Sequence, residues 1–183
     1  MKPLLWLVLL LSFLSTGRAV ILGYDVDFTP PDGWEQVKPD QSSPFPTLKF
    51  VPKDGRNAAV FVTLIPPELM VVDDAASLAK FFQFLCIIYL PTPDAKITAK
   101  ELKLPHGSGL YYSFEDPALI GKPVKPKDYK FATPVGLWLP PGRTIQATLF
   151  TDSLSSRDFT EGMQLLRSAV PAADATDSAS EKI

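Results

Sequence analysis

Side chains that could take part in catalysis are few in this chain. It has one histidine, His106 in the segment LPHGSG, and the nearest hydroxyl belongs to Ser108. A Ser-His-Asp arrangement would have to use this histidine. The segment lacks the correctly spaced glycines of a G-x-S-x-G turn, however, and its pattern indicates strand–turn–strand rather than strand–turn–helix. Turn geometry alone explains Pro, Gly and Ser here, so we expect no catalytic residue at this position.

Carboxylates offer two weak alternatives. Asp25 and Asp27 alternate onto one face of a candidate strand and could bind calcium, but the solvated face of an edge strand explains them more simply. Glu115 and Asp116 could act on a glycan together with a third acid, which nothing in the sequence identifies. One histidine and one cysteine do not make a zinc site without several carboxylates. We therefore expect no metal and no cofactor.

The only cysteine, Cys86, lies in SLAKFFQFLCIIYL, residues 77–90. This segment is apolar almost all round, as helices are when they are buried or span a membrane. It is too short, and too interrupted by Lys80 and Gln83, to span a membrane. The pattern predicts a central helix on a sheet, covered on its outer face by a loop. Cys86 would then be a core residue with a raised pKa and poor reactivity.

One segment has an unusual charge. PALIGKPVKPKDYKF, residues 117–131, contains four lysines and one aspartate, and three prolines stiffen it. Long loops with little periodicity are often functional. Two interpretations stay open: a solvated loop anchored by Leu119, Ile120 and Val124, or a positive surface for an acidic partner or an anionic lipid surface. The candidate binding residues are Lys122, Lys125, Lys127 and Lys130.

The first 19 residues have the features of a signal peptide. Lys2 precedes an apolar run over residues 4–14, and Gly17 and Ala19 fit the positions before a cleavage site. The apolar run is shorter than a membrane span, and no cysteine lies near the site, so a lipoprotein is not expected. We expect an exported protein, periplasmic or extracellular, with no membrane span in the mature chain.

The charge balance excludes one class of partner. The full chain has 18 basic and 20 acidic residues, and the leader holds two of the basic ones and no acid, so the mature chain would carry a net charge of −4. Nucleic-acid binding depends on many Lys and Arg contacts to phosphates, so nucleic acid is not an expected partner.

Alternating apolar residues and turn signals predict the sheet. TLKFV and AAVFVTLI flank PKDGRN, KITAKELKL and GLYYSFE flank PHGS, and VGLWL and TIQATLF flank PPGR, which gives three hairpins. With LGYDVDF they amount to seven or eight strands, chiefly antiparallel. A second helix is predicted over residues 155–170, with Phe159, Met163, Leu166 and Val170 on its apolar stripe. The tail, residues 172–183, is small and acidic, and we expect it to be disordered.

This order of elements resembles the PsbP-like superfamily. FTPPDGWEQV is similar to the opening element of that family, LKFVPKDGRNAAVFVTL to its hairpin, and FTEGMQLLRSAV to its last helix. The chain is accordingly identified as an exported bacterial member of unknown function. The resemblance implies a binding or accessory role, and it transfers no functional residue because the family has no shared catalytic set.

We therefore expect residues 20–171 to form a single α+β domain, one antiparallel sheet with helices packed on its faces. The expected function is that of a soluble accessory protein of the cell envelope, not an enzyme, that binds a protein partner. One alternative is a carrier holding a small apolar ligand between helix and sheet, with Phe81, Phe84, Tyr111, Tyr112 and Trp138 around it. A carboxylate-based hydrolase is the other.

Export gives the first testable prediction. When the protein is expressed with its own leader in a bacterium, the mature chain is expected to begin at Val20, because Gly17 and Ala19 place cleavage after Ala19. N-terminal sequencing or intact mass of the exported protein checks this. A mature chain that keeps residues 1–19 would contradict the expected localisation.

Overall fold

The computed structural model of the chain describes residues 19–20, 26–38, 44–90, 92 and 95–172. The predicted leader up to residue 18 and the predicted disordered tail from residue 173 lie outside the described residues. The first described strand, β1 (Ala19–Val20), spans the predicted cleavage site.

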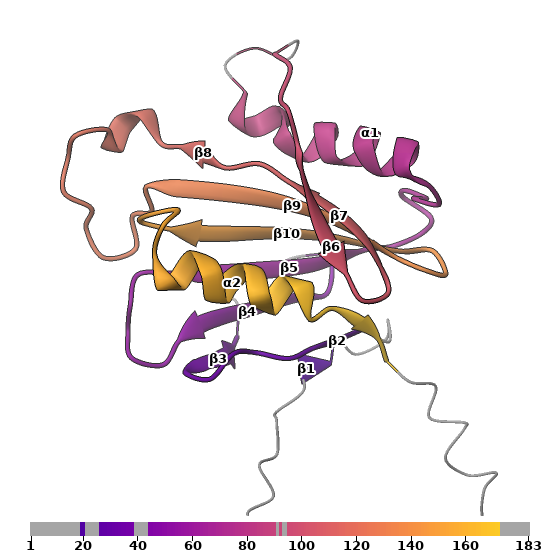
Figure 1. Ribbon diagram of the computed structural model, residues 1–183, viewed down its shortest axis with the longest axis horizontal. Helices are drawn as coiled ribbons and strands as arrows, with labels where there is room; N and C mark the ends of the chain where they lie inside the picture. Colours follow the sequence, from indigo (N-terminus) through magenta and orange to yellow (C-terminus); the bar gives the residue numbers. More distant parts are fainter. Residues whose placement is uncertain (1–18, 21–25, 39–43, 91, 93–94, 173–183) are drawn as a thin grey trace, which may run out of the picture.

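The fold is α+β, as predicted, and its main element is an eight-stranded antiparallel sheet (Figure 1). Seven strands lie side by side in the order β3-β4-β5-β10-β9-β7-β6, and β8 pairs with β9 outside this path. The strands are β3 (Trp34–Val37), β4 (Thr47–Pro52), β5 (Ala59–Ile65), β6 (Lys100–Leu104), β7 (Gly107–Tyr111), β8 (Phe114–Glu115), β9 (Phe131–Leu139) and β10 (Arg143–Thr151).

All three predicted hairpins are present. β4 pairs with β5, β6 with β7 and β9 with β10, each antiparallel. The turn between β4 and β5 uses Gly55 at φ 76°, a left-handed conformation that favours glycine. Because β10 also pairs with β5, two hairpins distant in sequence join into one sheet.

A second, three-stranded sheet consists of β1, β2 (Val26–Phe28) and β11 (Val170–Pro171), in the order β1-β2-β11. All three residues of β2 are buried, and Phe28 packs on Phe50 of the large sheet, with ring centroids 6.2 Å apart. The expected solvated face is therefore wrong at Asp27, which is buried because this sheet covers one end of the core. Asp25 lies outside the described residues.

The first helix, α1 (Ala75–Cys86), begins at a capping box. Asp74 accepts a hydrogen bond from the backbone N–H of Ser77, and the Ser77 hydroxyl oxygen accepts one from the backbone N–H of Asp74. These bonds satisfy N–H groups that the helix leaves unpaired. The α-helix ends earlier than predicted, at Cys86, and continues as the 3₁₀ turn η1 (Ile87–Tyr89).

The second helix, α2 (Arg157–Arg167), is shorter than the predicted span. Its N-cap is Ser156, whose hydroxyl accepts a hydrogen bond from the N–H of Phe159 at 3.1 Å. A further 3₁₀ turn, η2 (Pro117–Leu119), follows β8 and is capped by Asp116.

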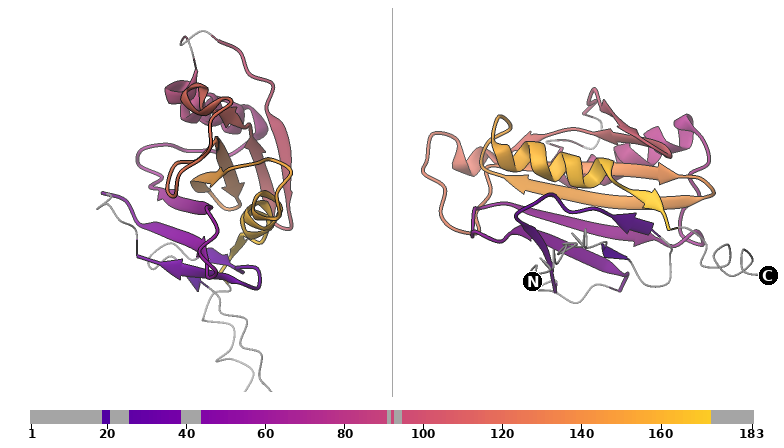
Figure 2. Two further views of the ribbon diagram at one scale, coloured as in Figure 1. Left: turned by 90° about the vertical axis from the view of Figure 1, so that its left-hand side faces the viewer. Right: turned by 60° about the horizontal axis from the view of Figure 1, so that its bottom comes forward.

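The two helices pack on opposite faces of the large sheet (Figures 1 and 2). On the face of α2, every second residue of β4, β5 and β10 is buried, and β2 joins α2 in covering them. On the other face α1 contacts β9 and β7. Its buried residues Leu78, Phe81 and Leu85 form a smaller core there with Val72, Leu110 and Trp138.

Two glycines allow the helices to approach the sheet. A Cβ on Gly136 of β9 would lie 3.2 Å from the Phe81 ring of α1. A Cβ on Gly162 of α2 would lie 2.5 Å from a methyl carbon of Leu149, which is itself fully buried in β10. Side chains larger than hydrogen do not fit at either contact without movement of the core.

Cys86 is fully buried, and burial raises its pKa to about 12. The prediction of a core cysteine is confirmed. We expect a thiol reagent at mildly alkaline pH to leave Cys86 unmodified in the native protein and to modify it fully in denaturant, because reaction requires an accessible thiolate. Mass spectrometry of both samples measures the difference. Rapid stoichiometric labelling of the folded protein would contradict the buried position.

The contact at Gly162 gives a stability prediction. Alanine favours a helix over glycine by about 1 kcal/mol, but a methyl group pressed into a filled core costs about 1–3 kcal/mol. We expect Gly162→Ala to lower the free energy of unfolding in urea by about 1 kcal/mol. The exposed Gln164→Ala in the same helix is the control and should change it by less than about 0.5 kcal/mol. A stabilised Gly162→Ala would show that α2 can move away from Leu149.

Candidate functional site

The outer surface of α1 is apolar and open to solvent. Phe84 is 61% exposed, Ile87 46% and Ile88 78%, and these three residues form the α1 ridge. The expectation that a loop covers this surface is wrong for the described residues. The helix is buried only on the side that faces β9 and β7, and the segment before it adds exposed Leu69 and Val71.

The face of the large sheet beside α1 is also partly open. Most residues of β4, β5 and β10 that point to this face are half-buried, in alternation with buried neighbours, and Ala59 and Thr144 are the fully buried exceptions. Phe61 and Phe150 pack edge to face here with centroids 5.9 Å apart, and the Tyr129 ring lies 5.2 Å from that of Phe150. The Lys49 ammonium lies 5.3 Å from the Phe61 centroid. An aromatic row therefore crosses the open face.

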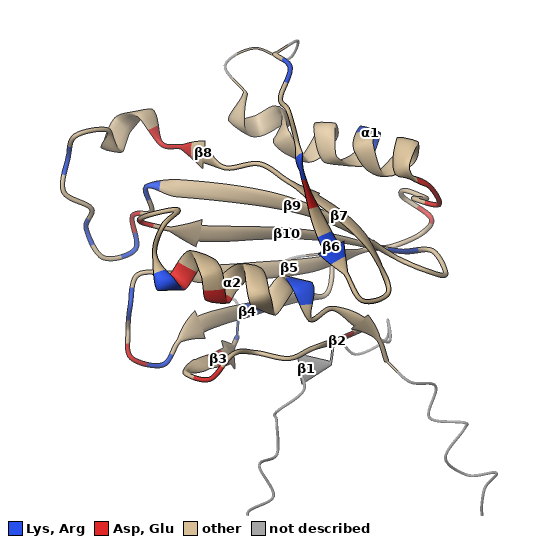
Figure 3. Ribbon diagram, in the orientation of Figure 1, with Lys and Arg blue, Asp and Glu red and all other residues tan. Residues whose placement is uncertain are grey.

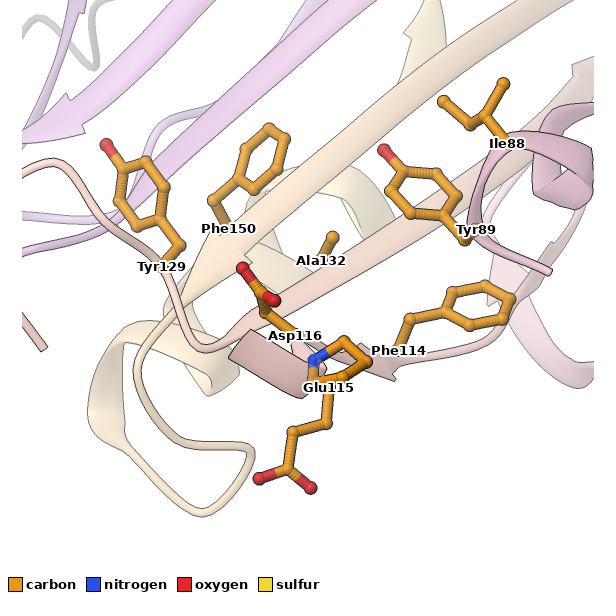
Figure 4. A pocket seen from close by; sticks show the side chains of 9 residues that line it. Ile88, Tyr89, Phe114, Glu115, Asp116, Tyr129, Ala132 and Phe150 are labelled. Atoms are coloured by element: carbon orange, nitrogen blue, oxygen red, sulfur yellow. The ribbon is translucent and has the colours of Figure 1, made fainter. Parts of the chain in front are cut away.

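At one end of this face lies a pocket of about 360 Å³ (Figure 4). It is bounded by η1 on one side and by β8, η2 and the ends of β9 and β10 on the others. Its lining residues are Ile88, Tyr89, Phe114, Glu115, Asp116, Pro117, Tyr129, Ala132 and Phe150. The volume is in the lower part of the range typical of small-molecule sites.

Aromatic rings flank the pocket in two pairs (Figure 4). Tyr89 and Phe114 stack with centroids 5.2 Å apart, and Tyr112 packs edge to face on Phe114. Tyr129 and Phe150 form the opposite pair. Burial raises the pKa of Tyr89, and its hydrogen bond with Thr148 opposes that shift. The phenol is therefore neutral across the physiological pH range.

The two adjacent carboxylates have different orientations. In Figure 4 the Asp116 side chain points in among the rings, whereas the Glu115 side chain extends away from them. Both the side chain and the backbone of Asp116 are hydrogen-bonded. Its carboxylate accepts a hydrogen bond from the N–H of Ala118 at 2.8 Å, and its own N–H donates to the carbonyl of Lys130 at 2.8 Å. Glu115 forms an ion pair with the Lys130 ammonium at 3.1 Å.

The lysine-rich loop begins at the same pocket and lies beyond the ends of β9 and β10 (Figure 3). Lys122, Lys125 and Lys127 are exposed. Lys130 is half-buried and differs from them, because it pairs with Glu115 and lies 5.7 Å from the centroid of the Phe131 ring. The structure thus groups three of the four predicted lysines on one solvated loop.

A side chain for which no role was predicted anchors this loop. The amide of Asn57, the only asparagine in the chain, donates to the carbonyl of Asp128 at 2.6 Å and to the Asp152 carboxylate at 3.0 Å. It accepts from the N–H of Lys127, whose φ is 75°. Ile120, expected to be an apolar anchor, is instead 59% exposed. Nothing in the sequence distinguishes Asn57, as the anchor of this loop, from an asparagine that only occupies a turn.

A charged cluster joins the β4–β5 turn to α2. Arg56 pairs with Asp54 at 2.9 Å, with Glu161 at 3.2 Å and with Asp158. The indole N–H of Trp34 donates to Glu161 at 2.9 Å. Burial opposes ionisation of Glu161, but hydrogen bonds from Trp34, Arg157 and Arg56 outweigh it and lower the pKa. These bonds attach the start of α2 to the turn, so we assign the cluster a structural role.

The other sequence-predicted groups do not meet in one site. His106 is exposed in the β6–β7 turn, next to the half-buried Ser108. Within the described part of the chain, no three His, Cys, Asp or Glu residues gather as a metal site would need. The same residues include no helix of sufficient length and apolarity to cross a membrane.

The aromatic residues expected around a carried ligand are also separated. Phe81 is buried against Trp138 in the α1 core, Phe84 is on the exposed ridge, and Tyr111 packs with the core on the other face. The lining of the described pocket includes none of these, nor Tyr112. Space between α1 and the sheet is taken up by the α1 core, and the pocket lies beyond the end of that helix.

Comparisons with known proteins place the chain in no family. No model of a protein family matches it, and no curated protein matches it. Among solved structures, the Saccharomyces cerevisiae Ran-binding protein Mog1p is 10% identical over 85% of this chain and 94% of its own, with a TM-score of 0.48. A point mutant of the protein Mog1 gives 10% identity, 87% and 97% coverage, and the same TM-score of 0.48.

These findings correct the assignment made from the sequence. Membership of the PsbP-like superfamily is wrong on this comparison, since no family model matches and the similar structures are Mog1 proteins. The motifs behind the assignment, a Gly-Trp dipeptide, a hairpin and an amphipathic helix, are common to many small α+β proteins. At this level of similarity the solved structures add no argument about function.

Proposed function

We propose that the chain is an exported accessory protein of the cell envelope that acts by binding a protein partner. The observation that carries the proposal is the α1 ridge, in which Phe84 of α1 and Ile87 and Ile88 of the following turn η1 are all exposed. Contiguous apolar groups on the surface of a soluble domain commonly mark an interaction site. The signal-peptide pattern of the first 19 residues supports export.

The ridge has neighbours suited to an interface. Ile88 also lines the pocket, so the ridge is continuous with the aromatic residues of the open face. Aromatic side chains at the centre of an interface contribute a large part of its binding energy, and a polar rim surrounds them. The described part of the chain offers this combination on the face that α1 leaves open.

The lysine-rich loop supplies the charge at the rim. Lys122, Lys125 and Lys127 are exposed on a backbone that Asn57 holds in place. Exposed charges of one sign accelerate association with an oppositely charged partner, and salt screens this effect over about 8 Å at physiological ionic strength. The proposed partner therefore has an apolar contact surface bordered by acidic residues.

Replacement of the ridge tests the proposal. Phe84→Ser with Ile88→Ser is expected to leave Tm within about 2 °C of the wild type, because both side chains are largely exposed. It is expected to weaken retention of the envelope partner at least about tenfold, because the apolar contact is lost. Affinity enrichment from an envelope extract, with quantification by mass spectrometry, measures retention.

Two further variants make the test specific. Leu154→Ser removes another exposed apolar side chain, just before α2, and should retain the partner. Lys122→Gln with Lys125→Gln and Lys127→Gln should reduce retention at low salt and abolish its salt dependence. A partner is assigned only if the ridge variant loses it and Leu154→Ser keeps it. Equal retention by all variants would contradict the proposed surface.

A further inference from the structure

We propose that the pocket between η1 and β8 is a binding site for an organic cation, a methylated ammonium group on a short stem. The structure puts one carboxylate, that of Asp116, among the two aromatic pairs that flank the pocket (Figure 4). This inference concerns a ligand site and goes beyond the protein-binding function proposed above. The site shares only Ile88 with the α1 ridge, and its recognition chemistry rests on other residues.

The rings provide the first part of the recognition. Tyr89 and Phe114 lie on one side of the pocket, Tyr129 and Phe150 on the other. The face of an aromatic ring is electronegative and attracts a cation within about 6 Å of its centroid, more strongly when water is excluded. Methylated ammonium groups suit such sites because they carry a positive charge and lose little hydration when apolar surfaces surround them.

Asp116 provides the second part. Its hydrogen bonds with Ala118 and Lys130 fix the backbone and one carboxylate oxygen, so the negative charge is held in position before a ligand arrives. The adjacent carboxylate does not compete for the ligand, because Glu115 turns away and pairs with Lys130. Asp116 is itself solvent-exposed, so its carboxylate attracts a cation through a partly screened interaction and not as a buried ion pair.

The nearby positive charges oppose this preference only weakly. Lys130 is neutralised by Glu115 at 3.1 Å, and Lys122, Lys125 and Lys127 are solvent-exposed on the loop. Solvent and salt screen all of these exposed charges, that of Asp116 included. The position of the Asp116 carboxylate among the rings, and not its burial, therefore favours a positive ligand.

Two sources could supply such a group. One is a free small molecule with a trimethylammonium head, and the other is a methylated lysine side chain on a partner protein. A volume of about 360 Å³ accommodates either head group with part of its stem. The recognition chemistry is the same in both cases, so the test includes one arm for each source.

Calorimetric titration of the purified protein is the primary test. The probes are choline, its neutral isostere in which a tert-butyl group replaces the trimethylammonium group, and a short peptide with one trimethyllysine. We expect saturable binding of a cationic probe that is about tenfold tighter than that of the isostere. Tighter binding of choline identifies a small-molecule source, and tighter binding of the peptide identifies a protein source.

Adjacent carboxylates give a matched pair of variants. Asp116→Asn keeps an oxygen that can accept from the Ala118 N–H but removes the charge, and it is expected to reduce cation affinity about tenfold. Glu115→Gln removes a charge one residue away and frees the Lys130 ammonium from its ion pair, so it is expected to reduce affinity by a smaller factor, about two- to threefold. Both variants should bind the neutral isostere as the wild type does.

Phe150→Leu tests the ring contribution separately. It keeps an apolar side chain but removes the π face, so cation affinity should fall about threefold while the isostere is unaffected. Circular dichroism confirms that each variant is folded. The proposal is overturned if no cationic probe binds saturably, if choline and its isostere bind equally, or if Asp116→Asn and Glu115→Gln have the same effect. If the Asp116→Asn variant loses cation binding but still retains the protein partner, the cation site and the protein-binding surface are independent of each other.

Discussion

The geometry of this molecule depends on a mismatch between the width of a helix and the width of a sheet. A helix with its side chains is about 10–12 Å across, and neighbouring strands are about 4.8 Å apart, so one helix covers about two strands. The large sheet has seven strands side by side, and α1, with 12 residues, is the helix on one face. It covers β9 and β7, and β10, β5 and β4 keep a half-exposed surface there.

The opposite face is closed by several elements at once. α2 packs on β10, the three-stranded sheet packs beside it, and the fully buried residues of five strands meet between them. The close contact between Gly162 and Leu149 sets the distance between α2 and β10. The bonds of Arg56 and Trp34 to Glu161 set the position of α2 along the sheet. The main core lies on this side, which leaves the other side available for binding.

Polar contacts position the lysine-rich loop and the Asp116 side chain on the open side, whereas apolar packing positions α1. Asn57 holds the lysine-rich loop through its amide, and Asp116 is fixed by one hydrogen bond from Ala118 and another to Lys130. Such bonds are directional and keep side chains in place without burying them. An exposed α1 ridge, a stiff positive loop and an aromatic pocket thereby lie on a single face.

The sequence by itself determined the local structure: the three hairpins, the two helices, the α+β class and the buried Cys86 all follow from residue patterns within a few positions. The orientation of Phe150 could also be predicted, since Ile145, Ala147 and Leu149 alternate with it. What only the tertiary structure decided is which residues meet across the chain. Asn57 with Asp128, the two aromatic pairs and the open outer surface of α1 depend on the order of strands in the sheet. Strand pairing over long separations leaves no periodic signal in a single sequence, so the candidate site became visible only in the folded chain.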